Sequence, residues 1–297
     1  MSAMDPGGRN DAWPLICPVC ERELRSGPGS LVCPSGHSFD VAREGYVNLL
    51  PPQHRVRGIE GDSLAMLQAR RRFLESGHYR LLLDQLVAEV GSCLAHSDVA
   101  RSDAARGACV LEVGCGEGYY IGSIAERLKG RGDATPVFVG ADISKSAVRL
   151  ASRRYHHARF LVADVRRRIY LQTGSANVLL DVFAPRDASE FARVVPPSGT
   201  AIVVIPSEAH LASLRTALGL LDIQEDKEAH VRERLRDGFR LADRKELRYP
   251  MELSADSAMD VMRMGPSSRH RTEDSAALGG DSIATEAAFV ILRLERT

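Results

Sequence analysis

The sequence predicts an α/β fold, in which a Rossmann-like, doubly wound parallel sheet follows a small N-terminal zinc-ribbon-like domain. From Ala108 onward, apolar runs of strand length alternate with helical stretches, which is typical of such a sheet. A glycine-rich loop follows the first of these runs, and two closely spaced Cys/His pairs precede them near the N-terminus. With 297 residues and 44% apolar content, the chain can bury one large core and support a small accessory module.

The composition excludes several classes of protein. No apolar run approaches the ~18 residues of a membrane span, and the N-terminus lacks the charged-then-apolar order of a signal peptide, so we expect a cytoplasmic protein. Three of the six cysteines lie between positions 17 and 33, which favours a reduced protein with one metal site over a disulfide scaffold. The formal net charge is zero, so a polyanionic partner would have to be bound by local clusters of charge.

Three segments are expected along the chain. Residues 1–50 form the zinc-binding domain, and its first twelve residues are Gly-, Pro- and Asp-rich and expected to be disordered. Residues 51–107 form a linker and helical segment: 51–61 lack apolar periodicity, one helix begins at Asp62 or Ser63, and a second covers 79–96. Residues 108–297 form the large α/β domain.

Within the large domain, the pattern predicts five buried strands separated by helices. The strands are expected in the segments 108–114, 136–143, 159–165, 176–183 and 200–206, and the helices near Tyr119–Leu128, Lys145–Arg154, Ala188–Val194 and after Pro206. Towards the C-terminus, the segments 239–253 and 286–296 are expected to form two antiparallel edge strands that flank a helix near Ala255–Met264.

The two Cys/His pairs predict a metal site. Cys17-x2-Cys20 is followed, after twelve residues, by Cys33-x3-His37, and three thiolates with one imidazole are a tetrahedral ligand set suited to Zn²⁺. The residues between the pairs look like a strand, a turn and a strand, which would bring the pairs together. Such a site has no open position for water, so one structural ion that folds a small module is the expected role.

The glycine-rich loop predicts a nucleotide-like cofactor. Gly114, Gly116 and Gly118 give Gly-x-Gly-x-Gly after the first strand, and glycine alone would also serve a tight structural turn. An acidic residue lies near the end of that strand, Asp142 ends the second and Asp164 follows the third. Asp142 would lie by a ribose diol and Asp164 by an adenine amino group. Together they indicate an S-adenosylmethionine site; a nicotinamide site is the rival, but its glycine spacing differs.

Basic clusters are candidates for contacts with nucleic acid. They occur at Arg70–Arg72, from Arg153 to Arg159, and at Arg166–Arg168. The alternative is that these side chains are exposed to solvent on helix faces and bind no partner. Three successive residues of a helix cannot all face one way, so among the first cluster only Arg70 and Arg71 are retained as candidates. The run Arg166, Arg167 and Arg168 would lie just past the cofactor-side end of the third strand.

Five stretches together resemble one known family. The zinc module is followed by HSFDVAREGYVNLL, QARRRFLESGHY, VGCGEGYY, VFAPR and MGPSS. This combination resembles the 23S rRNA (guanine-N1-)-methyltransferases, and especially the macrolide-resistance subgroup of actinomycetes. The resemblance extends from about Trp13 to the end of the chain. Arg269 departs from it, because an aromatic residue is expected after the paired serines, and this puts a base-stacking role of that position in doubt.

The resemblance implies a fold, an activity and site residues. The large domain would be a class I methyltransferase that binds S-adenosyl-L-methionine, and the N-terminal domain would help recognise RNA. Tyr79, Glu117, Gly118 and His210 would contact the cofactor, and the Cys/His pairs would bind zinc. The protein would be a homodimer whose domains form a cleft for a 23S rRNA hairpin near the macrolide site. VFAPR and MGPSS look like the resistance subgroup, whereas VGCGEGYY looks like the housekeeping one, so the exact nucleotide stays open.

Methylation of guanine N1 requires that this nitrogen lose its proton, so a base within hydrogen-bond reach is worth seeking. Asp181, at the end of the fourth strand, is the candidate catalytic residue. The alternative is that Asp181 faces solvent or caps a turn, while Phe183 and Pro185 pack the strand end. Two rival functions are a small-molecule methyltransferase with a zinc lid, which acidic or aromatic pocket residues would favour, and a zinc-ribbon RNA-binding protein with an inactive domain, against which the intact glycine loop argues.

Overall fold

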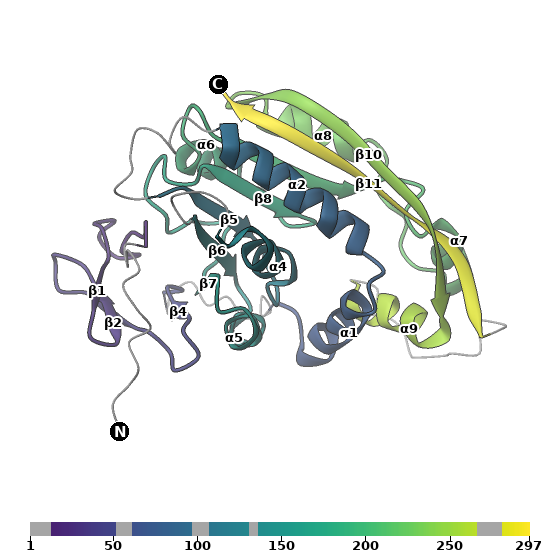
Figure 1. The fold of residues 1–297 in the computed structure, drawn as a ribbon, viewed down its shortest axis with the longest axis horizontal. Helices are drawn as coiled ribbons and strands as arrows, with labels where there is room; N and C mark the ends of the chain where they lie inside the picture. The colour runs from purple at the N-terminus through teal and green to yellow at the C-terminus, as the bar shows by residue number, and fades with distance from the viewer. Residues whose placement is uncertain (1–12, 52–60, 97–106, 131–135, 266–280) are drawn as a thin grey trace.

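The computed structural model describes residues 13–51, 61–96, 107–130, 136–265 and 281–297 (Figure 1). The predicted disorder of residues 1–12, most of the predicted linker at 51–61 and most of the polar break at 97–107 therefore lie outside the described residues. The same is true of Arg269 and of the last three residues of MGPSS.

The zinc module contains a three-stranded antiparallel sheet in the order β1-β2-β3. Its strands are β1 (Arg25–Gly27), β2 (Ser30–Val32) and β3 (Ser38–Asp40). The turn between β1 and β2 contains Gly29 at φ +72°, a left-handed conformation that glycine adopts without strain. The predicted strand, turn and strand between the two Cys/His pairs are confirmed.

The large domain is built on an eight-stranded sheet in the order β10-β11-β9-β8-β5-β6-β7-β4. Its strands are β4 (Val47–Asn48), β5 (Cys109–Val113), β6 (Val137–Asp142), β7 (Arg159–Val162), β8 (Val178–Val182), β9 (Thr200–Pro206), β10 (Phe239–Ser254) and β11 (Ser282–Arg296). All neighbours from β4 to β9 are parallel, and β10 and β11 are antiparallel additions. The chain order reverses at β5, and such a switch point is where open α/β sheets bind ligands.

Two strands differ from the predictions. Of the two C-terminal strands, only β10 lies at an edge, because β11 pairs with β9 from Phe289 to Glu295, so the prediction of two edge strands is wrong for β11. The continuous buried run from Ala287 to Leu292 is typical of such an interior strand. At the opposite edge, Val47 and Asn48 of the N-terminal segment pair with β7, so the segment before residue 50 contributes to the main sheet.

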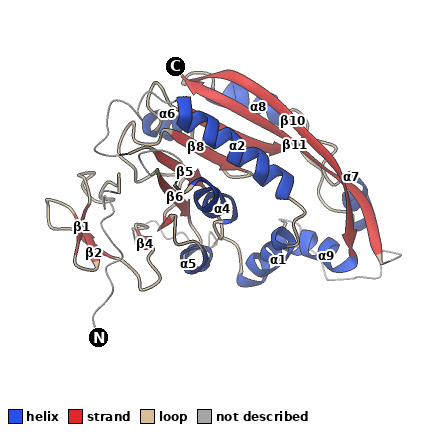
Figure 2. Cartoon of the chain, viewed as in Figure 1, coloured by secondary structure: helices blue, strands red, loops and turns tan. Residues whose placement is uncertain are grey.

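Helices cover both faces of the sheet (Figure 2). They are α1 (Leu64–Glu75), α2 (Arg80–His96), α4 (Tyr119–Leu128), α5 (Lys145–Arg154), α6 (Ala188–Val194), α7 (Ala212–Leu218), α8 (Lys227–Leu235) and α9 (Ala255–Met264). Buried residues of α2, α4 and α5 belong to the apolar cluster on one face of the sheet, and those of α6 and α8 to the cluster on the other. The expected helices are all present, whereas α8 was not predicted.

The zinc module packs directly on the large domain. Its buried residues share one apolar cluster with β5, β7 and β8. The Ile16 N–H donates to the Tyr170 carbonyl at 3.0 Å, and the Gln172 N–H donates to the Pro14 carbonyl at 2.8 Å. The guanidinium of Arg159 lies 5.0 Å from the ring centre of Trp13, a cation–π distance. The module is therefore attached by backbone pairing as well as by apolar contact.

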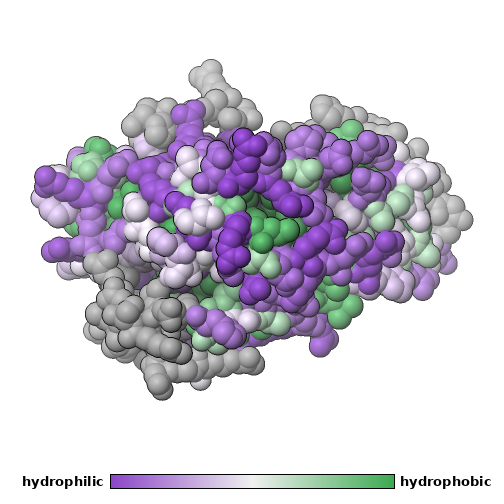
Figure 3. All heavy atoms as spheres, turned by 90° about the horizontal axis from the view of Figure 1, so that it is seen from above, coloured by the Kyte–Doolittle hydropathy of each residue, from purple (hydrophilic) through white to green (hydrophobic). Residues whose placement is uncertain are grey.

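The outer surface is mostly hydrophilic in the view from above, with a small hydrophobic area near the middle of that face (Figure 3). No described helix has the length and hydrophobicity needed to span a membrane.

Candidate cofactor site and metal centre

The four predicted metal ligands converge. Their ligand atoms all lie within 4.8 Å of one another. The Sγ atoms of Cys20 and Cys33 are 3.6 Å apart, and Nδ1 of His37 lies 3.6 Å from Cys17 Sγ and 3.4 Å from Cys33 Sγ. Zinc–sulfur bonds of ~2.3 Å in a tetrahedron separate two sulfurs by ~3.8 Å, so these residues fit one Zn²⁺.

The surroundings of Cys20 favour its metal-binding form. Hydrogen bonds from the Ser35 side chain and the Arg22 backbone lower the pKa of Cys20 to about 6, and the thiolate is the form that binds metal. None of the four ligands lines either of the two cavities described below. The position of the metal centre therefore indicates a structural role for the ion.

The first cavity, of about 500 Å³, lies at the carboxyl ends of β5, β6, β7 and β8. Five of the predicted cofactor residues line it: Gly114, Gly116, Glu117, Asp142 and Asp164. Gly118 is not part of its wall. Carboxylates at the ends of neighbouring strands can accept the hydrogen bonds of a ribose diol and of an adenine amino group, so the cavity fits S-adenosylmethionine.

The glycines of the loop have different structural reasons. Gly114 has φ +64°, and a Cβ at this position would lie 2.6 Å from Cβ of Ala184. Gly118 has φ +77°, and a Cβ there would lie 2.7 Å from the ring of Phe160. Gly114 therefore allows the segment after β8 to approach the loop, whereas Gly118 allows the start of α4 to pack on the sheet.

Asp142 fastens the glycine loop to the end of β6. The Gly116 N–H donates to one carboxylate oxygen of Asp142 at 2.9 Å, and the Ser144 N–H donates to the other at 2.8 Å. Burial raises the pKa of Asp142, and these two N–H groups oppose that rise. Each carboxylate oxygen keeps a further lone pair, so the predicted contact with a ribose remains geometrically possible.

The side chains of the first basic cluster diverge along α1, as expected from helix geometry. Arg70 forms an ion pair with Asp62 and lines both cavities. Arg71 pairs with Glu117 of the glycine loop at 2.7 Å, and Arg72 binds Asp260 of α9. Arg71 therefore positions the glycine loop, and Arg70 is the member of the cluster that faces ligand space.

The second and third basic clusters are largely engaged inside the protein. In the second, Arg153 pairs with Glu44 at 3.1 Å. In the third, Arg166 donates to Asp164 at 3.0 Å and lines the first cavity, while Arg167 lies 3.6 Å from the same carboxylate. These partners favour the alternative that the clusters do not contact RNA, and contact of Arg166 or Arg167 with RNA stays a prediction.

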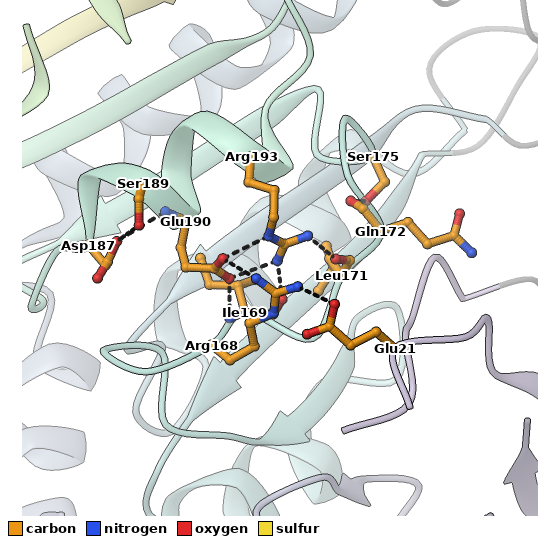
Figure 4. Close-up of polar contacts among 10 residues, drawn as sticks. All are labelled: Glu21, Arg168, Ile169, Leu171, Gln172, Ser175, Asp187, Ser189, Glu190 and Arg193. Carbon is orange, nitrogen blue, oxygen red and sulfur yellow. Dashed lines mark hydrogen bonds and ion pairs between the residues drawn. The ribbon is translucent and has the colours of Figure 1, made fainter. Parts of the chain in front are cut away.

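Arg168 connects the zinc module to the large domain (Figure 4). One of its nitrogens lies 3.0 Å from Glu21, which follows the first pair of zinc ligands, and another lies 2.7 Å from Glu190 of α6. Glu190 also accepts hydrogen bonds from Arg193 at 2.7 Å and from the Ile169 N–H at 2.8 Å. This geometry indicates a structural role for Arg168, and its contact with RNA stays a prediction.

A second cavity, of about 670 Å³, adjoins the first. Arg70 and the segment from Phe183 to Pro185 line both. Tyr79 and His210, predicted from the resemblance to contact the cofactor, line this second cavity and not the first. Their contact with a cofactor stays a prediction.

Tyr79 and His210 form a buried pair. Their Oη and Nε2 atoms are 2.9 Å apart, and the Ala288 N–H donates to Nδ1 of His210 at 3.1 Å. Because Nδ1 accepts, we assign the imidazole proton to Nε2, which donates to Tyr79. Burial, followed by the charges of Arg215 and Lys227, lowers the pKa of His210 to about 3. The imidazole is therefore neutral at physiological pH.

Asp181, the candidate catalytic base, is fully buried and lines neither cavity. Its carboxylate lies 2.6 Å from Nε of Arg186 and accepts the Ala184 N–H at 3.0 Å. Burial raises the pKa of Asp181 to about 7, against the opposing effect of Arg186. The geometry favours the alternative interpretation, in which Asp181 holds the turn after β8; a role as base stays a prediction.

Sequence reasoning missed two features of the second cavity. The first is Phe183, a residue that has φ +59° and is 42% exposed, although the alternative interpretation of this segment expected it to pack the strand end. The second is a basic face on α8, formed by Lys227, His230 and Arg234. The spacing of these three residues at i, i+3 and i+7 is the signal that could have revealed one face of a helix.

Comparisons with known proteins agree with this geometry. A zinc-ribbon family described as "RlmA, N-terminal" matches residues 15–56, and a family described as "Methyltransferase domain" matches residues 110–199. A 23S rRNA (guanine(748)-N(1))-methyltransferase of Streptomyces fradiae is 39% identical, covering 89% of this chain and 88% of the relative. A putative 23S rRNA (guanine-N(1)-)-methyltransferase of Micromonospora griseorubida is 36% identical (86% and 87%), and one of Bacillus subtilis is 30% identical (68% and 67%).

Proposed function

The chain belongs to the family of 23S rRNA (guanine-N1-)-methyltransferases, and from this premise we propose that its target is one guanine of a 23S hairpin near the macrolide site, corresponding to guanine 748 in the name of the Streptomyces fradiae relative. Methylation there would confer macrolide resistance on the bacterium that makes the protein. The protein would act in the cytoplasm, where ribosomes are assembled, as a homodimer whose zinc modules help to present the hairpin.

The adjoining cavities support this proposal most directly. One is built from a glycine loop and strand-end carboxylates, and the described residues that line the other are basic or neutral, with no Asp or Glu among them. The two share Arg70 and the segment from Phe183 to Pro185. A methyl donor and an anionic acceptor can therefore meet at one place. An uncharged small molecule would not require this basic wall, so the small-molecule alternative is disfavoured.

S-adenosylmethionine, when bound, supplies a methyl group on a sulfonium for in-line transfer to N1. The protein's task is to hold the two reactants in a near-attack geometry. Asp142 and Asp164 would accept hydrogen bonds from the cofactor's ribose and adenine, while Arg71 keeps Glu117 and the glycine loop in place. Asp181, through Arg186 and the Ala184 N–H, fixes the segment that separates the cavities.

The test is a methylation assay with mapping of the product. The protein, S-adenosylmethionine labelled in its methyl group and unmodified 23S hairpin transcripts are incubated, and the modified base is located by mass spectrometry. We expect one N1-methylguanine at the position corresponding to 748, and no label in a matched transcript that carries adenine there. Label at a neighbouring guanine would refute the proposed target, and absence of label from RNA would refute the activity.

The proposed resistance is tested separately in cells. Expression in a macrolide-sensitive bacterium that lacks this methylation should raise the inhibitory concentration of at least one macrolide that contacts the hairpin. A strain with full methylation of the target guanine and unchanged inhibitory concentrations of the macrolides tested would overturn the resistance while leaving the enzymatic activity intact.

A further inference from the structure

The second cavity has a strongly one-sided charge. Its wall contains the cationic side chains of Arg70, Arg186, Lys227 and Arg234, together with the histidines His210, which is neutral, and His230. These residues come from two helices, α1 and α8, and from two loops, which are far apart in the sequence. Among the described residues of the wall, Tyr79 is the remaining titratable group, and burial raises its pKa, so it stays a neutral donor. The cavity therefore suits a ligand that is anionic or becomes so.

Among the described residues, no carboxylate forms an ion pair with the basic face of α8, although the charge of Arg234 helps to lower the pKa of Asp187. Val231 and Leu235 are buried, and Glu228 pairs with Arg244 of β10 at 2.9 Å, so packing orients the helix. Among the described residues, the ion pairs of this region do not include Lys227 or Arg234. Burial, together with the nearby charges of Arg186 and Arg215, lowers the pKa of Lys227. A bound anion would relieve this repulsion between cations.

Phe183 marks the boundary where the two cavities meet. It is one of the few non-glycine residues of the described chain with positive φ, a conformation that costs energy and is often kept for function. Its ring lies 5.7 Å from that of Phe289, which supports one side. Phe183 is 42% exposed as a residue and lines both cavities, so aromatic surface is available to a planar ligand.

Resting on the proposed function, we propose that the second cavity receives the extruded target guanosine of the RNA, with its base against Phe183 and its adjoining phosphates on the α8 face formed by Lys227, His230 and Arg234. A guanine that leaves its stack needs a replacement surface, which an aromatic ring provides. Phosphates need cations that are not already paired with carboxylates. This assigns substrate contacts to a part of the chain that the RNA-binding predictions did not include.

The positive wall also bears on the proton at guanine N1. Positive charge favours the ionised form of a neutral acid, so the cavity lowers the pKa of the bound base and lets the proton leave to water. Arg70 and Arg186 face the cavity beside Phe183 but are paired with Asp62 and Asp181, whereas Lys227 faces it from α8. Removing one of these charges should therefore move the pH dependence of methylation as well as weaken RNA binding.

The first test compares three single substitutions on one helix. Lys227→Gln and Arg234→Gln remove charges from the cavity wall, whereas Arg232→Gln removes the same charge from α8 at a position outside that wall. We expect Lys227→Gln and Arg234→Gln each to raise the Kd for the hairpin by about tenfold and to reduce its salt dependence by about one ion. Lys227→Gln should also shift the rise of kcat/KM to higher pH. Binding of S-adenosylhomocysteine should not change.

The control variant makes failures distinguishable. If the wild type methylates guanine N1 but Lys227→Gln and Arg234→Gln behave like Arg232→Gln in Kd, salt dependence and pH profile, the inference is wrong and the proposed function stands. If the wild type does not label the hairpin, the proposed function fails, and the RNA Kd values still report on the α8 face.

The second test addresses the base. Phe183→Leu keeps apolar bulk but removes the aromatic face, and Phe183→Tyr keeps that face. Since base–aromatic stacking is worth a factor of about ten or more, we expect kcat/KM for RNA to fall to that extent in Phe183→Leu and to be largely restored in Phe183→Tyr, with unchanged melting temperatures. Equal activities of Phe183→Leu and the wild type would overturn the stacking role.

Discussion

At the scale of single residues, Gly114 and Ala184 approach each other closely where the two cavities adjoin. Gly114 belongs to the glycine loop of the first cavity, and Ala184 lies in the segment shared by both. A Cβ on Gly114 would meet Cβ of Ala184 at 2.6 Å, and its φ of +64° disfavours any side chain. The spacing of the loop predicted a need for glycine, but the close approach of Ala184 is visible only in the structure.

We predict that Gly114→Ala displaces the segment after β8, because neither backbone can absorb so short a contact. The expected loss of stability is about 1–3 kcal/mol, with cofactor binding weakened at least tenfold. Calorimetric titration with S-adenosylhomocysteine and urea unfolding measure the two effects. Adding Ala184→Gly removes the clashing atom and should restore part of the binding. A double variant no better than Gly114→Ala alone would show that backbone strain, and not the contact, is responsible.

Glu112 is a buried residue that lines the first cavity, and its carboxylate should make the stability of the protein depend on pH. Its carboxylate accepts the Ile121 N–H at 2.9 Å, and burial raises its pKa from 4.5 to about 8. Between these two values the native protein holds a proton that the unfolded chain has released, so this group makes stability fall as pH rises from 4.5 to 8. Glutamine can accept the same hydrogen bond without the ionisation.

Glu112→Gln should therefore flatten the pH dependence. We compare the free energy of unfolding of Glu112→Gln with that of the wild type at each pH. This difference should favour the variant by roughly 2–4 kcal/mol more at pH 8 than at pH 5. Urea denaturation at both pH values gives this difference, and Glu126→Gln, which changes an exposed carboxylate of α4, serves as the control. Parallel pH curves for Glu112→Gln and the wild type would contradict a raised pKa of Glu112.

At the scale of elements, strongly periodic segments could be predicted and pairings could not. The helices α4, α5, α6 and α9 begin and end where the pattern placed them, because caps and amphipathic spacing are local. The place of β11 between β9 and β10 depends on what covers its two faces. The helix α8 escaped prediction because its exposed residues are mostly charged and only Val231 and Leu235 are buried in it.

The contact between the zinc module and α6 yields a prediction for Arg168. Arg168→Gln removes the guanidinium that Glu21 and Glu190 share, while Glu190 keeps Arg193. We expect a loss of about 1–2 kcal/mol and faster release of zinc to a chelator. Arg167→Gln is the matched control, because Arg167 is half exposed and its ion pair with Asp164 is long at 3.6 Å. Equal rates of zinc release from the two variants would contradict the structural role of Arg168.

At the scale of the whole molecule, the separation between module and large domain is less sharp than the sequence suggests. The ligand spacing was enough to predict the metal centre, because paired knuckles are local features. The packing of the module's apolar residues against the main sheet, and the pairing of Val47 and Asn48 with β7, are not local. For the same reason the second cavity, assembled from distant segments, could not be read from any single motif.

The shared core sharpens what loss of zinc should do. Cys20→Ser removes one of the four ligands, so the module should unfold and expose its side of the apolar cluster. No residue of 13–51 lines either cavity, so binding of S-adenosylhomocysteine should stay within about threefold of the wild type, as loss of an element outside the binding wall costs little affinity. The melting temperature should fall, because the core is shared, and RNA methylation should be lost, because the module helps present the hairpin.

Calorimetry, thermal unfolding and the hairpin assay on the same preparation separate these effects. Cofactor binding lost in proportion to methylation would mean that the module's main task is to complete the fold of the catalytic domain.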